Sequence, residues 1–262
     1  MKLLVKLGGT LLDSPDSRHS LAAQIAAAAR KGMEIVVVHG GGKQMTRYLA
    51  ERGIESRFVN GLRVTTPETV DAVLKVFAGS VNHELVASLN RAGALAVGLS
   101  GIDALLAEAE QMDPELGAVG RVTKSNAELL SLLTAHRYVP VVACVAGDRE
   151  GRVFNVNADQ MAVACAAAFG AAQLIFLTDV PGVMGAERQV LPTLSTDDGA
   201  QLIAAGVATG GMQAKLEAAM AALRAGVAQV RIVPGAAENV VARLLDGEAI
   251  GTRMVTNEVV VQ

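Results

Sequence analysis

Short apolar runs alternate with longer segments of mixed polarity along almost the whole chain. The runs are rich in Val, Leu and Ile, and they cover residues 3–6, 35–38, 95–98, 139–145, 174–177 and 230–233. Strands that are buried on both faces have this composition, which is typical of a parallel sheet. The alternation predicts an α/β protein, a three-layer α/β/α sandwich around a mainly parallel central sheet with right-handed crossovers.

Signals that start helices stand between these runs. A capping hydroxyl followed by proline at the first helical position occurs at positions 14–15 and 66–67. Ser125 and Glu128 have the spacing of a capping box, so a helix is also predicted to start there. Residues 182–191 carry polar residues between two valines, which favours a hairpin over a crossover.

The composition narrows the class of protein. Of the 262 residues 51% are hydrophobic, and no Pro- or Ser-rich linker divides them, so residues 1–262 are predicted to form one domain. The net charge of −3 gives no reason to expect nucleic acid or a membrane as a partner. The two cysteines lie in apolar runs, and no signal peptide or membrane span is evident, which predicts a cytoplasmic protein.

Two lysines lie in glycine-rich settings at opposite ends of the chain. Lys6 is followed by Gly8 and Gly9 at the end of the first predicted strand, and Lys215 follows glycines 210–211 where a helix opens. A transferring phosphoryl group spreads its charge over several oxygens, which lysines and bare backbone amides stabilise. Each segment alone also fits a plainer interpretation, a turn or a solvated lysine.

Three glycines follow His39 at the start of a predicted helix, where backbone amides make a site for anions. Gly42-Lys43 does not complete a P-loop, because the next residue is Gln44 and position 37 is not glycine. His39 is predicted to be structural, since a carboxylate acceptor is already ionised near neutral pH and needs no general base.

Polar residues mark three further places. Arg63 stands just before the helix start at 66–67, and a guanidinium binds carboxylates with two parallel hydrogen bonds. Asn155, Asn157 and Asp159 lead into an alanine-rich helix, which a simple helix cap would also explain. Asp179 lies in a turn after a strand, and a plain turn is again the alternative.

The order and the amino-acid sequences of these segments resemble those of the amino acid kinase family over nearly the whole chain, from Lys6 to Thr252. The resemblance implies the carbamate kinase-like fold of that family. Within the family it points to members that phosphorylate the γ-carboxylate of N-acetyl-L-glutamate by direct in-line transfer from ATP, with Mg²⁺, in arginine biosynthesis. Aspartokinases are longer, and uridylate and carbamate kinases resemble the chain less around residues 61–65 and 155–159. An aminoadipate-type kinase and a non-catalytic sensor on the same fold remain as alternatives.

The resemblance also implies the roles of individual residues. The catalytic residues would be Lys6, Lys215, Asp159, Gly8 and Gly9, with Asp159 organising the two lysines and the amides of Gly8 and Gly41 contacting the phosphoryl group. The acceptor would be bound by Gly41, Gly42, Arg63 and Asn155. The nucleotide would be bound by Asp179, Val180, Pro181, Gly182, Val183, Met184, Val207, Ala208 and Thr209. No metal site on the protein is expected, because phosphates and water would hold most of the Mg²⁺.

The same resemblance divides the chain by function near residue 170. Residues 1–170 would bind the acceptor and form the contact of a homodimer, and residues 171–262 would bind the nucleotide. The family members that form arginine-inhibited hexamers carry an N-terminal helical extension, whereas this chain opens directly in a predicted strand. A homodimer with little inhibition by arginine is therefore expected.

Overall fold

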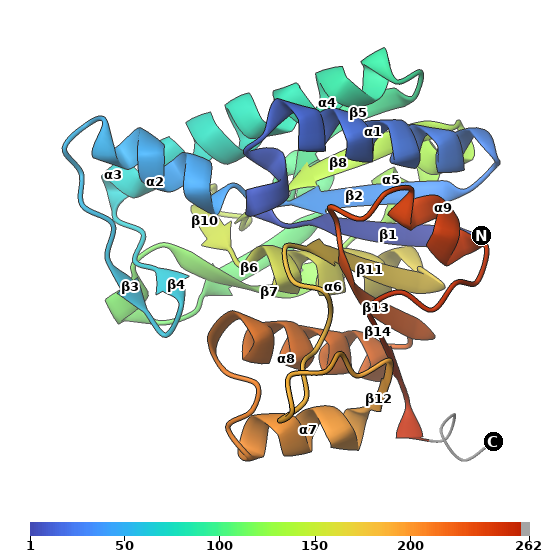
Figure 1. Cartoon of the computed structure of the whole chain (residues 1–262). Coiled ribbons are helices and arrows are strands. Elements are labelled where there is room, and N and C mark those ends of the chain that lie inside the picture. Colours follow the sequence, from blue (N-terminus) through green and yellow to red (C-terminus); the bar gives the residue numbers. More distant parts are fainter. Residues whose placement is uncertain (258–262) are drawn as a thin grey trace.

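An eight-stranded sheet runs through the middle of the molecule, with helices on both faces (Figure 1). The structure is a computed structural model that describes residues 1–257, so most of the tail at 256–262 lies outside the described residues. The strand order is β12-β14-β13-β11-β1-β2-β8-β5, and every neighbouring pair is parallel except β13 and β14. The predicted three-layer sandwich around a mainly parallel sheet is confirmed.

The strands of this sheet match the predicted apolar runs closely. They are β1 (Lys2–Leu7), β2 (Glu34–His39), β5 (Leu95–Ser100), β8 (Tyr138–Ala143), β11 (Gln173–Thr178), β12 (Thr193–Ser195), β13 (Gln229–Pro234) and β14 (Thr252–Val255). The run at 139–145 is not one strand, because the chain leaves the sheet at Cys144. β1 lies at the centre between β2 and β11, so the chain builds one side of the sheet from its first part and the other side from its last part.

Nine α-helices are described in residues 1–257. They are α1 (Pro15–Arg30), α2 (Gly42–Ala50), α3 (Pro67–Val73), α4 (Asn82–Arg91), α5 (Glu128–Ala135), α6 (Ala158–Phe169), α7 (Thr196–Ala204), α8 (Gly210–Arg224) and α9 (Val240–Leu245). Helices α1, α4 and α9 pack together over one face, and α5, α6 and α8 cover the other (Figure 1). None of the helices in this described part is long and apolar enough to cross a membrane.

Helix ends follow the predicted signals at two of three places. The Ser14 and Thr66 hydroxyls accept hydrogen bonds from the amides of residues 17 and 69, as predicted for caps before proline. The capping box predicted at Ser125 is wrong, because Ser125 ends a strand and pairs with Ala107. Pairing with a neighbouring strand takes precedence over the local capping pattern there.

Several elements were not predicted. Four short strands close into a small barrel: β6 (Ala107–Gln111), β7 (Val119–Ser125), β9 (Val145–Gly147) and β10 (Val153–Val156). A separate two-stranded hairpin consists of β3 (Phe58–Val59) and β4 (Leu62–Arg63). The helix that is predicted to start at residue 67 continues from α3 into a π-helix at Leu74–Val81, and α4 follows it directly. Short 3-10 turns occupy Gly9–Leu12, Asp103–Leu105 and Pro114–Leu116.

Candidate active site

The carboxyl ends of three adjacent strands meet at one edge of the sheet. Leu7 at the end of β1 pairs with His39 of β2 on one side and with Leu177 of β11 on the other. The glycine segments after β1 and β2 therefore leave the sheet next to each other, and Asp179 follows on the third strand. Ligands of open α/β sheets bind at such an edge, where the chain runs to opposite sides from neighbouring strands.

One carboxylate joins the two lysines that the sequence singles out. The Lys6 Nζ lies 2.6 Å from Oδ1 of Asp159, and the Lys215 Nζ donates a hydrogen bond of 3.2 Å to Oδ2. The Lys6 and Asp159 side chains are each 8% exposed, and that of Lys215 is 18% exposed. Residues separated by more than two hundred positions in the sequence thus share one nearly water-free centre.

Local structure explains how these three side chains meet. Lys6 lies at the end of β1 and, by the alternation of the strand, faces α6 on one side of the sheet. Asn157 caps α6, with its Oδ1 accepting from the amides of residues 159 and 160, so Asp159 lies in the first turn. A carboxylate is favoured there by the helix dipole. Lys215 reaches the same point from the second turn of α8.

The electrostatics of Asp159 are decided by its two partners. Burial alone would raise the pKa of the Asp159 carboxyl, but the positive charges of Lys6 and Lys215 outweigh it, so the pKa lies below its usual range. The carboxylate is charged at neutral pH. One negative charge against two ammonium groups leaves the centre with a net positive charge, which suits an anionic ligand.

The two glycine segments touch through their backbones. A Cβ atom added to Gly9 would lie 3.3 Å from the amide nitrogen of Gly42, so a side chain there would press on the neighbouring loop. A Cβ on Gly41 would lie 2.9 Å from the ring of Phe77, which packs against the loop from the π-helix. The absence of a side chain at Gly41 is therefore required by packing, whereas a Cβ at Gly9 would make a tight contact with the loop.

The amides of these glycines differ in their availability. The Gly8 amide donates a 3.0 Å hydrogen bond to the carbonyl of Leu177, so the donor expected there for a phosphoryl group is engaged by β11. Among residues 1–257 no hydrogen-bond acceptor is found for the amides of Gly9, Gly41 and Gly42. The available donors at this edge are therefore on Gly9 and on the loop after His39.

Arg63 lies on β4, in the hairpin that comes just before α3, as its place before the helix start at 66–67 led us to expect. It is 8% exposed, and its Nη2 donates to the Gly42 carbonyl at 3.1 Å and to the Thr46 hydroxyl at 2.8 Å. Its Nη1 donates to the hydroxyl of Ser56, and its guanidinium lies over the ring of Phe58. No acidic side chain of the described residues forms an ion pair with Arg63. The groups that contact its guanidinium are neutral hydroxyls, a carbonyl and an aromatic ring.

Asn155 is connected to the Arg63 strand through a residue that the sequence did not single out. Its side-chain amide donates to the Thr65 hydroxyl at 3.1 Å, and that hydroxyl donates to the carbonyl of Arg63 at 2.9 Å. Thr65 is 1% exposed. Thr65 belongs to the segment at residues 61–65 that carries Arg63, and this position could have identified it as a residue of the site.

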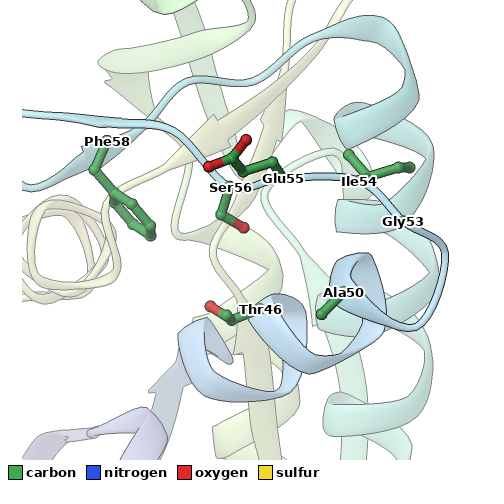
Figure 2. Close-up of a pocket in the computed structure, with 7 residues that line it drawn as sticks. All are labelled: Thr46, Ala50, Gly53, Ile54, Glu55, Ser56 and Phe58. Atoms are coloured by element: carbon green, nitrogen blue, oxygen red, sulfur yellow. The ribbon is translucent and has the colours of Figure 1, made fainter.

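A cavity of about 460 Å³ lies beside Arg63. It is lined by Thr46, Ala50, Gly53, Ile54, Glu55, Ser56 and Phe58, and Figure 2 shows these side chains between α2 and the segment leading into the hairpin. The two hydroxyls that bind Arg63 line it. The cavity does not reach Lys6, Asp159 or Lys215, so it marks space next to the guanidinium and not the centre of the lysines.

The segments expected to bind a nucleotide are held mainly by backbone. The loop after β11 folds back as predicted: Met184 bridges Val190 in antiparallel fashion, and the amide of Val183 donates to the Thr252 hydroxyl at 2.8 Å. Asp179 is exposed, and its carboxylate accepts from the Thr178 hydroxyl at 3.2 Å. Within the described chain, no group of three or more His, Cys, Asp or Glu side chains is placed to hold a metal.

A family model for the amino acid kinase family matches residues 1–234. The chain belongs to the amino acid kinase family. The predicted family is thereby confirmed, and with it the general activity of the family, ATP-dependent phosphoryl transfer.

Two named relatives sharpen this membership. The chain is 74% identical over 256 residues to the acetylglutamate kinase of Solibacter usitatus, covering 98% of this chain and all of that protein. It is 43% identical to the acetylglutamate kinase of Koribacter versatilis, covering 97% of this chain and 99% of that protein. Both relatives are named acetylglutamate kinase, which is the branch of the amino acid kinase family that the sequence analysis favoured.

A solved structure extends the comparison. The N-acetylglutamate synthase from Neisseria gonorrhoeae, complexed with coenzyme A and N-acetyl-glutamate, superposes with a TM-score of 0.87 at 25% identity. The match covers 98% of this chain but only 59% of that chain. The amino acid kinase fold therefore also occurs as one part of a longer protein with a different name, so fold alone does not fix the reaction.

Proposed function

We propose that this amino acid kinase transfers the γ-phosphoryl group of ATP to the γ-carboxylate of N-acetyl-L-glutamate, which gives N-acetyl-L-glutamyl 5-phosphate in arginine biosynthesis. The observation that carries the proposal is the Asp159 carboxylate bridging Lys6 and Lys215 beside the glycine loops. The high identity to named acetylglutamate kinases supports the choice of acceptor.

The transfer needs charge stabilisation more than acid–base chemistry. The γ-carboxylate is ionised at neutral pH and attacks the γ-phosphorus directly, while the bond to the β-phosphate oxygen breaks on the opposite side. Lys6 and Lys215 neutralise the charge that spreads over the phosphoryl oxygens, and Asp159 holds both ammonium groups in position. The amides of Gly9 and Gly41 contribute donors from the loops.

The acceptor is held by its α-carboxylate, the carboxylate that is not phosphorylated. Arg63 is buried and lacks an acidic partner among the described residues, so an α-carboxylate from the ligand would complete its charge balance. Asn155 lies next to it through Thr65 and is placed to contact the neutral acetamido group. Fixing one carboxylate leaves the γ-carboxylate free to approach the lysines.

The nucleotide would lie along the opposite side of the lysine centre, against residues 179–184 and 207–209. Mg²⁺, when bound, neutralises charge on the ATP phosphates. Both oxygens of Asp159 face lysines, so the exposed Asp179 is the residue that we expect to support the metal, and it would do so through water. Phosphates and water would supply the other ligands.

The direct test is detection of the acyl phosphate. Purified protein with MgATP, N-acetyl-L-glutamate and hydroxylamine should release ADP and form the hydroxamate in equal amounts, whereas glutamate or aminoadipate should give little. ADP release that does not depend on acetylglutamate, or none with any acceptor, would contradict the proposal. Formation of N-acetylglutamate from glutamate and acetyl-coenzyme A would instead assign the reaction named for the synthase relative.

We also propose that the protein is a cytoplasmic homodimer that pairs through residues 1–170. β5 is the outer strand of the sheet on this side, and Leu95 on it and its partner Tyr138 on β8 are exposed. An outer strand with apolar side chains is a template for pairing with a second copy. Light scattering should give the mass of a dimer, and Leu95→Lys should shift it to the monomer. A wild-type monomer or hexamer would contradict the pairing.

A further inference from the structure

A buried polar pair lies behind the glycine loop and takes no part in the chemistry described above. His39 is the last residue of β2 and is fully buried, and Asn82 is 1% exposed at the start of α4. Their side chains meet at 2.9 Å, from His39 Nε2 to Asn82 Nδ2. Buried polar groups that are fully hydrogen-bonded hold the surrounding backbone in one conformation, so we asked which part of the loop this pair holds.

The surroundings of Asn82 decide which atoms are donors. Its Nδ2 lies 2.9 Å from the Val141 carbonyl and 3.4 Å from the Leu99 carbonyl, both on strands of the sheet. Carbonyl oxygens only accept, so the nitrogen of the amide must face them and is itself a donor to His39. Gly98 makes this approach possible, since a Cβ there would lie 2.1 Å from Oδ1 of Asn82.

The donor from Asn82 fixes the tautomer of His39. Burial lowers the pKa of His39 to about 4, although the hydrogen bond to the Gly40 carbonyl acts in the opposite direction, so the ring is neutral at pH 7. A neutral imidazole has one donor and one acceptor nitrogen. Because Nε2 accepts from Asn82, Nδ1 carries the proton and donates to the Gly40 carbonyl, 2.8 Å away.

That carbonyl belongs to the same peptide group as the amide of Gly41. In a trans peptide the C=O and N–H bonds lie in one plane and point in opposite directions. Holding the carbonyl of Gly40 toward His39 therefore turns the N–H of Gly41 away from the ring, and no acceptor in residues 1–257 engages it. No cis peptide bond occurs in the described chain.

The π-helix supports the same peptide from a second direction. It carries Phe77, whose ring packs on Cα of Gly41, and it ends immediately before Asn82. The wider turn of a π-helix changes the phase of the residues that follow it, and such turns are frequent at functional sites. One stretch of helix thus contacts the loop directly at Gly41 through Phe77, and it acts on Gly40 indirectly, through the hydrogen bond of Asn82 to His39.

We infer that His39, held by Asn82 as the Nδ1–H tautomer, is a positioning residue that aims the Gly41 amide into the phosphoryl-transfer site. The inference rests on the proposed function. It assigns to His39 and Asn82 an effect on the orientation of a catalytic donor, without contact to either substrate.

Two substitutions at residue 39 distinguish the roles of the two ring nitrogens, Nδ1 and Nε2. In His39→Asn the side-chain amide nitrogen takes the place of Nδ1 and still donates to Gly40, so kcat should stay within about fivefold of wild type. In His39→Gln the amide reaches the place of Nε2 and the donor to Gly40 is lost. Because a misdirected donor forfeits part of the 10²–10³ that one such group contributes, kcat should fall roughly 10- to 100-fold, with KM for ATP nearly unchanged.

A surface histidine supplies the matched control. His83 makes the same kind of contact, Nδ1 to the Gly79 carbonyl at 2.8 Å, but it is exposed and forms no hydrogen bond with residues 39–42. His83→Gln should leave kcat unchanged. Equal losses in His39→Asn and His39→Gln, or no loss in either, would overturn the inference when both variants melt near the wild-type temperature.

Nitrogen NMR of ¹⁵N-histidine-labelled wild type tests the tautomer without relying on activity or on folding of the variants. The His39 signal, assigned by its loss in His39→Asn, should show a protonated Nδ1 and an unprotonated Nε2 from pH 6 to 8. A protonated Nε2, or titration in this range, would overturn the inference. If the wild type forms no hydroxamate from acetylglutamate, the proposed function fails and this measurement still decides the orientation of the ring.

Discussion

Residues 1–170 and residues 171–257 contribute to the candidate site in different ways. The first part holds its loops with buried polar side chains, among them Arg63, Thr65, His39 and Asn82, which are all at most 8% exposed. The second part presents exposed residues at 205–207 and 209–211 together with two charged side chains, Lys215 and Asp179. The proposed acceptor side is thus built in advance by directional hydrogen bonds, whereas the proposed nucleotide side relies on loops that side chains restrain little.

This difference suggests how each side recognises its ligand. A small dicarboxylate offers few groups, so its binding site must fix each of them with a side chain of the right geometry. A nucleotide triphosphate offers many oxygens that backbone amides and a metal can satisfy. Substitutions of side chains should therefore be more harmful on the acceptor side than on the nucleotide side, with Lys215 as the exception.

The largest effect is expected at the two lysines, one from each part of the chain. Lys6→Ala and Lys215→Ala should each lower kcat by about 10²–10³, because each removes a preorganised positive group from the developing charge. Steady-state kinetics on folded protein measure this. Lys43→Ala, at an exposed lysine after the glycine loop, is the control and should stay within twofold. A kcat within threefold of wild type for Lys215→Ala would refute its role.

The next effect concerns the acceptor alone. Arg63→Ala should lower kcat/KM for acetylglutamate by roughly 30- to 1000-fold, since about 2–4 kcal/mol of charge-assisted contact is lost, while KM for ATP stays nearly constant. Arg63→Lys should recover only part, because a point charge does not reproduce the fork of the guanidinium. Arg57→Ala, at an exposed arginine close by, is the control. A change in KM for ATP alone would show that the two sides are assigned in reverse.

A third effect is on stability and its dependence on pH. Asp159→Asn should lower the free energy of unfolding at pH 7 by roughly 1.5–3 kcal/mol, because charged hydrogen bonds to two lysines are weakened. The folded pKa of Asp159 is depressed, so its contribution is complete above the unfolded value near 4 and is lost as the pH falls through the folded pKa. Urea unfolding at pH 7 and pH 3 should show the gap between wild type and variant shrinking in acid. An equal gap at both values would contradict this.

The smallest effect separates packing from ligand binding within the glycine loop. Gly41→Ala should lower the melting temperature by roughly 2–5 °C, because its Cβ would press on the Phe77 ring. Gly42→Ala meets nothing within 4 Å in the protein and should leave the melting temperature unchanged. Thermal melting without ligands measures both. Equal melting temperatures for the two variants would show that Phe77 does not restrain the loop.

The sequence predicted the parts of this molecule that depend on local pattern. Buried strands read as apolar runs, and the residues 6, 159 and 215 were recognised through the family resemblance and then found together. What it missed depends on contacts between distant segments. In the barrel, β6 and β7 carry charged residues in place of an unbroken apolar run, and β9 and β10 have only three and four residues. The π-helix shows no compositional difference from an α-helix. The bond from Gly8 to Leu177 and the pair of His39 with Asn82 exist only because the sheet brings distant residues together.

The central claim is that Lys6 and Lys215 act as one unit because Asp159 holds both. A double-mutant cycle on kcat with Lys6→Ala, Lys215→Ala and the double variant tests it most directly. Removing one lysine should already release the other from its position, so the double variant should lose little more than the worse single variant. A combined loss equal to the product of the two single losses would show that the lysines act independently and would contradict the account.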